Sequence, residues 1–196
     1  ALDVTIQAQI LKLLKKLQFV KAEGPLIAQL WGLKPENFEA VARQIADGSL
    51  ARELGLPKGV NYVGIDLNMG CPAKSEVKNG ACSALIKPEN RELAGQIIEA
   101  TMRGAGTLPV SVKTRLGFSE VDLSWHKFLL GFDIDMLTIH WRTRKEMSKV
   151  PAHWELAPEI VKLRDAVAPH TKLVGNGDVM TREQGEELAK QYNLDG

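Results

Sequence analysis

The chain has 196 residues, of which 44% are hydrophobic and 25% are charged, values that are ordinary for a globular protein with one sizeable core. No apolar run reaches the ~18 residues of a membrane-spanning helix, and the first residues lack the basic-then-apolar pattern of a secretory signal. The 25 basic and 24 acidic residues leave a formal net charge of +1, so a nucleic-acid partner would have to be held by a local basic patch.

The hydrophobic pattern predicts helices and strands that alternate along the chain. A first helix is indicated by apolar residues at helical spacing between Ile6 and Leu17, and Gly24-Pro25 ends it. Strands are predicted over residues 26–30, 62–67, 110–113, 134–139 and 173–174. Helices are predicted from Pro35, from Pro88, and over residues 121–130, 156–167 and 182–192.

Strict alternation of strands and helices predicts an α/β fold with a parallel sheet. A doubly wound sheet and a (β/α)8 TIM barrel both satisfy the pattern. A complete barrel typically needs ~250 residues, so the five units predict an incomplete barrel or a smaller open sheet. No low-complexity linker divides the chain, and we expect residues 1–196 to form one domain.

The two cysteines, Cys71 and Cys82, match neither the spacing of a zinc site nor a disulfide framework. We therefore expect no metal site and a reducing, cytoplasmic setting. Cys82 follows Gly-Ala and precedes an apolar run, so we expect it to pack in the core near the start of a helix.

Polar residues follow each predicted strand, and the carboxyl ends of parallel strands share one face of such a fold. One cleft would thus receive an amide, a thiol, a lysine, an imidazole and a glycine-rich turn. The residues are Gln29, Asn68, Cys71, Lys113, His140, Arg142, Arg144, Asn176, Gly177 and Asp178. Singly, each has an ordinary explanation, such as a buried inert cysteine or a solvated basic loop. Together they predict a functional cleft.

In order and rough spacing, these segments resemble the tRNA-dihydrouridine synthases, which are flavin-dependent (β/α)8 barrel enzymes. The segments are Pro25-Leu-Ile-Ala-Gln29-Leu, Asp66-Leu-Asn-Met-Gly-Cys71-Pro, Val112-Lys113-Thr-Arg115-Leu-Gly117, Thr138-Ile-His140-Trp-Arg142-Thr and Gly175-Asn-Gly-Asp178. The Asn-Met-Gly-Cys-Pro box is the most specific of them.

The resemblance implies FMN as cofactor, NADPH as reductant and a uridine of tRNA as substrate. Hydride would pass from the flavin to C6 of uracil, and Cys71 would deliver the proton to C5, an enolate carbon that needs a general acid. Lys113 would hold the electron-rich pyrimidine edge of the flavin. Gln29, Asn68 and His140 would hydrogen-bond the flavin or the inserted uracil.

The resemblance also implies two binding regions beyond the reacting rings. Asn176, Gly177 and Asp178 would contribute to the flavin phosphate end, where backbone N–H groups suit an anion. Arg142 and Arg144 would face tRNA phosphates or the target nucleotide.

In this family the cysteine box follows the fourth barrel strand, so the five predicted strands would be the third to the seventh. The first two strands, the eighth strand and the C-terminal helical domain that binds tRNA would lie outside residues 1–196. Trp141 stands where the family usually has a small residue, and His153 where it tends to have an acidic one.

Two alternatives stay open. The chain could belong to another FMN-dependent barrel oxidoreductase that acts on a small pyrimidine-like molecule, which the near-neutral charge mildly favours. It could also be an inactive module that binds RNA or a partner through open barrel edges, since unpaired strands invite association. The oligomeric state is not predicted.

Overall fold

The computed structural model describes residues 25–196, and the helix expected between Ile6 and Leu17 lies outside the described residues. Five parallel strands form one sheet in the order β1-β2-β3-β4-β5. The strands are β1 (Leu26–Leu30), β2 (Tyr62–Asn68), β3 (Val110–Arg115), β4 (Met136–His140) and β5 (Lys172–Asn176). Because each strand pairs with the next one in the chain, the sheet has the strand order of a partial (β/α)8 barrel. In a doubly wound sheet the strand order reverses direction partway across the sheet.

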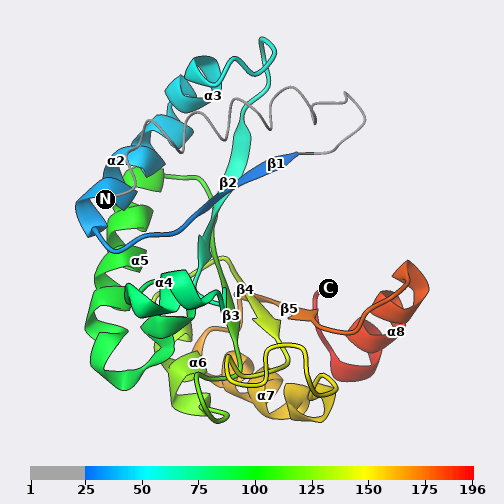
Figure 1. The fold of residues 1–196 in the computed structure, drawn as a ribbon. Coiled ribbons are helices and arrows are strands. Elements are labelled where there is room, and N and C mark those ends of the chain that lie inside the picture. The colour runs from blue at the N-terminus through cyan, green and yellow to red at the C-terminus, as the bar shows by residue number, and fades with distance from the viewer. Residues whose placement is uncertain (1–24) are drawn as a thin grey trace.

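The helices follow one another around the outside of the curved sheet (Figure 1). The longer ones are α2 (Pro35–Ala46), α5 (Arg91–Ala105), α6 (Leu123–Leu130), α7 (Ala157–Val167) and α8 (Arg182–Tyr192). The shorter ones are α3 (Ser49–Glu53), α4 (Lys74–Lys78) and the 3-10 turns η1 (Cys82–Ile86), η2 (Pro88–Asn90) and η3 (Trp154–Leu156). Within residues 25–196 the structure contains no helix that combines the length and the apolar composition of a membrane-spanning segment.

The predicted elements are all present among the described residues, and their boundaries differ for local reasons. The helix expected from Pro88 begins as η2 and becomes α5 only at Arg91. The helix expected from residue 121 begins at Leu123, because the side chain of Asp122 accepts a hydrogen bond from the Trp125 amide and caps the first turn. The sequence did not predict α3 and α4, since five residues are too few to show a helical period.

The two faces of the sheet differ in polarity. Leu67, Val112, Leu137 and Leu173 are register partners across β2 to β5, and each is at most 1% exposed. They belong to the core that the helices cover. Side chains alternate along a strand, so the neighbouring positions point to the concave inner face. That inner face carries the polar residues of the strand ends.

Candidate functional site

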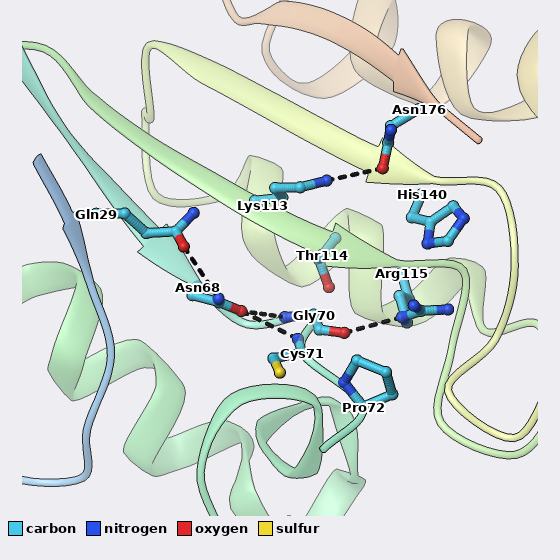
Figure 2. Close-up of a pocket in the computed structure, with 10 residues that line it drawn as sticks. All are labelled: Gln29, Asn68, Gly70, Cys71, Pro72, Lys113, Thr114, Arg115, His140 and Asn176. Atoms are coloured by element: carbon cyan, nitrogen blue, oxygen red, sulfur yellow. Dashed lines mark hydrogen bonds between the residues drawn. The ribbon is translucent and has the colours of Figure 1, made fainter. Parts of the chain in front are cut away.

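A pocket of about 220 Å³ lies at the carboxyl ends of the strands, and its lining residues converge from all five of them (Figure 2). The lining residues are Gln29, Asn68, Gly70, Cys71, Pro72, Lys113, Thr114, Arg115, His140 and Asn176. Six of the residues that the sequence singled out therefore meet in one place: Gln29, Asn68, Cys71, Lys113, His140 and Asn176.

Asn68 shapes the loop that carries the cysteine. Its side-chain oxygen Oδ1 accepts hydrogen bonds from the backbone amides of Gly70, at 3.2 Å, and Cys71, at 3.0 Å. Gly70 packs closely on β3, where an added Cβ would lie 3.1 Å from the carbonyl carbon of Thr114. An asparagine that folds back on the following amides forms a tight turn. The turn places Cys71, which is half-buried, against the pocket.

Asp66 anchors a chain of hydrogen bonds that ends at this turn. Its carboxylate accepts from Ser111 Oγ at 2.7 Å and from Gln29 Nε2 at 2.6 Å. Gln29 Oε1 in turn accepts from Asn68 Nδ2 at 3.1 Å. The chain sets which way both amides face, since each has one donor end and one acceptor end. Burial raises the pKa of Asp66, while the bonds from Ser111 and Gln29 act in the opposite direction.

Lys113 brings a partly buried cation to the opposite wall. Its Nζ donates to Asn176 Oδ1 at 2.9 Å, which links the ends of β3 and β5 (Figure 2). Burial lowers the pKa of Lys113, and Asp66 partly offsets this effect. Among the described residues no carboxylate lies within ion-pair distance of Nζ. The amine is therefore placed to meet an electron-rich group in the pocket.

Arg115 ties the cysteine turn to the loop that follows β4. Its Nε donates to the Gly70 carbonyl at 2.8 Å, and its Nη1 donates to the carbonyls of Thr143, at 3.2 Å, and Met147, at 3.0 Å. Arg115 lines the pocket although the sequence analysis gave it no role. The available signal was its position two residues after Lys113, which puts both side chains on the same face of β3.

Arg142 does not occupy the exposed position that we expected of a phosphate-facing cation. It is 5% exposed, and its guanidinium pairs with both carboxylate oxygens of Asp178 at 2.5 and 2.6 Å. Its Nη1 also lies 3.0 Å from Nε2 of His140. The sequence showed only a run of basic residues and could not reveal that the turn after β5 would supply a carboxylate partner.

The segment from Asn176 to Asp178 contributes to the pocket through Asn176 alone, the last residue of β5. Gly177 and Asp178 do not line it, and the role predicted for these three residues at a flavin phosphate stays a prediction. Gly177 has φ 127°, and an added Cβ would lie 2.9 Å from Cδ2 of His140. Glycine is needed there for both the conformation and the close approach.

Arg144 lies outside the pocket and packs on an aromatic ring. Its guanidinium stands 5.3 Å from the centre of the Phe118 ring, and Lys87 Nζ stands 4.6 Å from the same centre. Two cations on one ring form a local basic patch, consistent in charge with a polyanionic partner.

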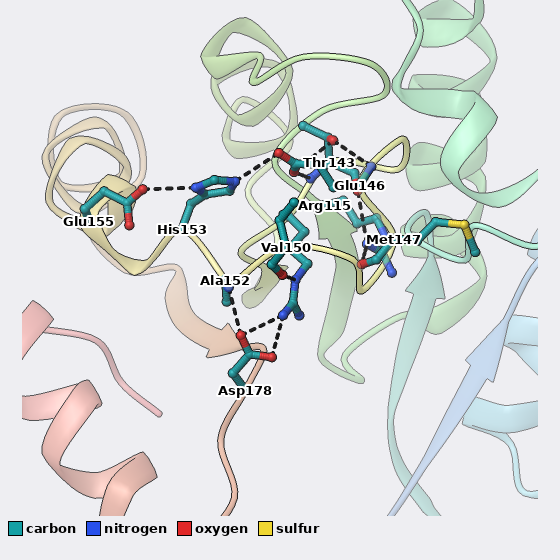
Figure 3. Close-up of polar contacts among 10 residues, drawn as sticks. Arg115, Thr143, Glu146, Met147, Val150, Ala152, His153, Glu155 and Asp178 are labelled. Atoms are coloured by element: carbon teal, nitrogen blue, oxygen red, sulfur yellow. Dashed lines mark hydrogen bonds and ion pairs between the residues drawn. The ribbon is translucent and has the colours of Figure 1, made fainter.

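The loop between β4 and α7 is held by an acid–histidine–acid cluster (Figure 3). His153 contacts Glu146 through Nε2 and Glu155 through Nδ1, both at 3.0 Å. Glu146 also accepts from the amide and hydroxyl of Thr143. The hydrogen bond to Glu146 is the main reason that the pKa of His153 is raised. His153 therefore holds this loop together through its contacts with two carboxylates.

The second cysteine is where the sequence placed it. Cys82 is 2% exposed and opens η1. Burial, with a smaller contribution from the nearby Cys71, raises its pKa to about 12. Trp141 is fully buried and packs on Trp154 at 5.5 Å between ring centres. Residues 25–196 contain no cluster of His, Cys, Asp and Glu side chains that could hold a metal ion.

Comparison with known proteins gives one consistent family. The family model described as dihydrouridine synthase matches residues 4–196. The chain is 48% identical over 184 residues to the probable tRNA-dihydrouridine synthase 2 of Bacillus subtilis. It is 47% identical over 184 residues to probable tRNA-dihydrouridine synthases of Staphylococcus aureus and Staphylococcus epidermidis. Each alignment covers 92% of this chain and 51% of the relative, so the chain spans about half the length of the curated relatives that it matches.

Proposed function

This chain belongs to the dihydrouridine synthase family, and from that premise we propose that the full-length protein reduces a uridine of tRNA to 5,6-dihydrouridine. FMN would be the cofactor and NADPH the reductant. The observation that supports this proposal most is the meeting of Cys71, Lys113 and His140 in one pocket at the strand ends. The names of the relatives supply the class of substrate.

The donor set of the pocket suits a flavin. When bound, FMN supplies the hydride for C6 of the uracil. Lys113 Nζ is a partly buried cation without an ion-pair partner among residues 25–196, and such a cation suits a ring that gains negative charge on reduction. Gln29 and Asn68 present amides whose orientation is set through Asp66. The bonds that fix these groups exist before any ligand binds, which lowers the cost of ordering the site.

Cys71 is our candidate for the proton donor. It lines the pocket at the end of β2, on a turn held by Asn68 Oδ1 and by Arg115 through the Gly70 carbonyl. Protonation of C5 breaks the S–H bond of Cys71 and forms a C–H bond, and the thiolate then regains a proton from solvent. A general acid works only when it is held within hydrogen-bond reach of the atom it protonates, and two independent anchors of one turn meet that need.

The pocket accounts for part of a cofactor site. Ligand sites usually enclose ~300–1,000 Å³, whereas the described residues enclose about 220 Å³. We therefore propose that residues 1–196 form one partial flavin-binding barrel domain, to which further barrel strands and a tRNA-binding domain are added in the full-length protein. The coverage of about half of each relative supports this division.

For the RNA itself, the partly buried Arg144 on Phe118 remains our candidate phosphate contact. The burial of Arg142 and its ion pair with Asp178 speak against a phosphate contact for Arg142. We propose that Arg142 acts inside the protein.

The experiment that tests the proposed function uses the full-length protein, NADPH and tRNA that lacks dihydrouridine. Dihydrouridine in the tRNA is measured by mass spectrometry, and bound flavin by absorbance. Cys71→Ala should retain flavin and lose about 10²- to 10⁴-fold in turnover, the usual contribution of a general acid. Cys82→Ala is the matched control, because Cys82 is a buried thiol that does not line the pocket, and it should turn over normally.

Two outcomes would contradict the proposal. Turnover of Cys71→Ala equal to that of the wild type would remove Cys71 from the mechanism. Oxidation of NADPH by a free pyrimidine, with tRNA left unreduced, would favour a small-molecule oxidoreductase.

A further inference from the structure

Arg142 is a buried cation whose hydrogen bonds lead to the pocket on one side and to the surface on the other. Its Nη2 donates to both oxygens of Asp178, and its Nε donates to the Val150 carbonyl at 2.6 Å. Its Nη1 lies 3.0 Å from Nε2 of His140. Asp178 is held in turn, because its Oδ2 also accepts from the Ala152 amide at 2.8 Å (Figure 3). The guanidinium is therefore fixed in both position and orientation.

The contact between Arg142 and His140 determines which ring nitrogen carries the proton. A guanidinium has only N–H donors and keeps its charge at every accessible pH. Nε2 of His140 must therefore accept this hydrogen bond, because a protonated Nε2 would place two N–H donors against each other with no acceptor between them. A neutral ring then carries its proton on Nδ1.

The packing of the ring shows which edge faces the ligand. A Cβ added to Gly177 would lie 2.9 Å from Cδ2 and 3.2 Å from Nε2 of His140, so this edge lies against protein. Nδ1 lies on the other side of the ring, and it has no hydrogen-bond partner among residues 25–196. His140 lines the pocket, so the Nδ1 edge is the one that it can offer to a ligand.

We propose that Arg142 and Asp178 are positioning residues that hold His140 as the neutral Nδ1–H tautomer. His140 then serves the pocket as a hydrogen-bond donor and not as an acid or a base. This inference rests on the proposed function only for the identity of the ligand. With a uracil in the pocket, Nδ1–H would donate to a ring carbonyl, and Cys71 would be left as the proton donor.

The charged groups around His140 act in the same direction. Burial lowers its pKa to about 4, and the cations Arg115 and Lys113 of β3 and Arg142 of the following loop contribute. Asp178 acts to raise the pKa of His140, but both of its carboxylate oxygens accept hydrogen bonds from Arg142. A ring that stays neutral through the physiological range agrees with the tautomer that the hydrogen bond requires.

The test reads the tautomer directly by NMR. Full-length protein labelled with 15N in histidine is recorded by long-range 15N–1H correlation between about pH 5 and 8, the range in which an ordinary histidine titrates. His140→Gln identifies the His140 signals. We expect the wild-type ring to show a protonated Nδ1, an unprotonated Nε2 and no titration over this range.

Arg142→Met removes the donor and the charge while keeping an extended side chain. The ratio of Nδ1–H to Nε2–H tautomer should fall about tenfold or more, the factor that a hydrogen bond from a charged donor is worth. The ring should also begin to titrate at higher pH. Arg164→Met is the matched control, since Arg164 is 8% exposed and pairs with Asp165 and Asp195 away from the pocket. It should leave the His140 signals unchanged.

An imidazolium or an Nε2–H tautomer in the wild-type protein at neutral pH would overturn the proposal, whatever the Arg142→Met variant shows. An Arg142→Met protein with wild-type His140 signals would overturn it as well. The NMR readout requires neither FMN nor tRNA. Failure of the tautomer assignment is therefore distinct from failure to form dihydrouridine.

Discussion

The turn that carries Cys71 depends on one side chain, and Asn68→Ala tests that dependence. The substitution leaves the amides of Gly70 and Cys71 without their acceptor, and Gln29 Oε1 without its donor. A net hydrogen bond is worth about 0.5–1.5 kcal/mol, so three bonds give about 1.5–4.5 kcal/mol. Water reaches this partly exposed turn and replaces part of the loss, so we expect the lower end, about 2 kcal/mol, in the free energy of unfolding.

Two measurements on the full-length protein check this reasoning. Urea unfolding gives the change in the free energy of unfolding, and alkylation by iodoacetamide gives the reactivity of the Cys71 thiol. Loosening of the turn should raise the alkylation rate several-fold, because a change of 1.4 kcal/mol in an opening equilibrium is about a factor of ten. The buried Cys82 should react slowly in all variants.

Asn90→Ala is the matched control for Asn68→Ala. The side chain of Asn90 is also hydrogen-bonded to the backbone, since its Nδ2 donates to the Ala84 carbonyl at 2.8 Å, but Asn90 does not line the pocket. It should cost about 1 kcal/mol in the free energy of unfolding and leave the alkylation rate of Cys71 unchanged. If Asn68→Ala matches the wild type in both measurements, or if Asn90→Ala changes the alkylation rate as much, Asn68 does not hold the turn.

Three further predictions concern separate parts of the site. Lys113→Met should weaken flavin retention or slow flavin reduction, because it removes the cation that faces the pocket; a wild-type flavin spectrum and reduction rate would contradict this role. His153→Gln should destabilise the protein more at pH 6 than at pH 9. Because the pKa of His153 is raised, its contribution to the free energy of unfolding is complete below the ordinary pKa of 6.5 and is lost as the pH rises through the pKa of the folded state. Urea unfolding at both pH values measures this difference. Arg144→Met should weaken tRNA binding and reduce its salt dependence. An unchanged slope of log affinity against log salt concentration would show that Arg144 does not contact a phosphate.

The fold was largely predictable because its signals are local and periodic. Pro35 opens α2, with Phe38, Ala42 and Ile45 buried on one face, as the helical spacing predicts. Strand ends were less predictable, since β3 and β4 continue through polar residues as far as Arg115 and His140. Hydrogen bonding to a neighbouring strand continues after the apolar pattern stops, and the sequence does not show that neighbour.

The candidate site divides in the same way. Residues at the carboxyl ends of parallel strands must share one face, so Asn68, Lys113 and His140 could be grouped from their positions alone. The roles of Asp66 and Arg142 could not be predicted. One lies within a strand and the other in a basic run, and their partners belong to other elements.

By itself, the sequence determined the alternation of strands and helices, the polar strand ends and the cysteine box, because periodicity and turn chemistry act over a few residues. Only the tertiary structure decided the contact between His140 and Arg142, the burial of Arg142 and the direction in which Gln29 and Asn68 face their neighbours. These properties depend on which donor meets which acceptor across the sheet and between loops. A hydrogen bond of this kind joins residues that lie as many as 63 positions apart, between Lys113 and Asn176, and no local pattern encodes it.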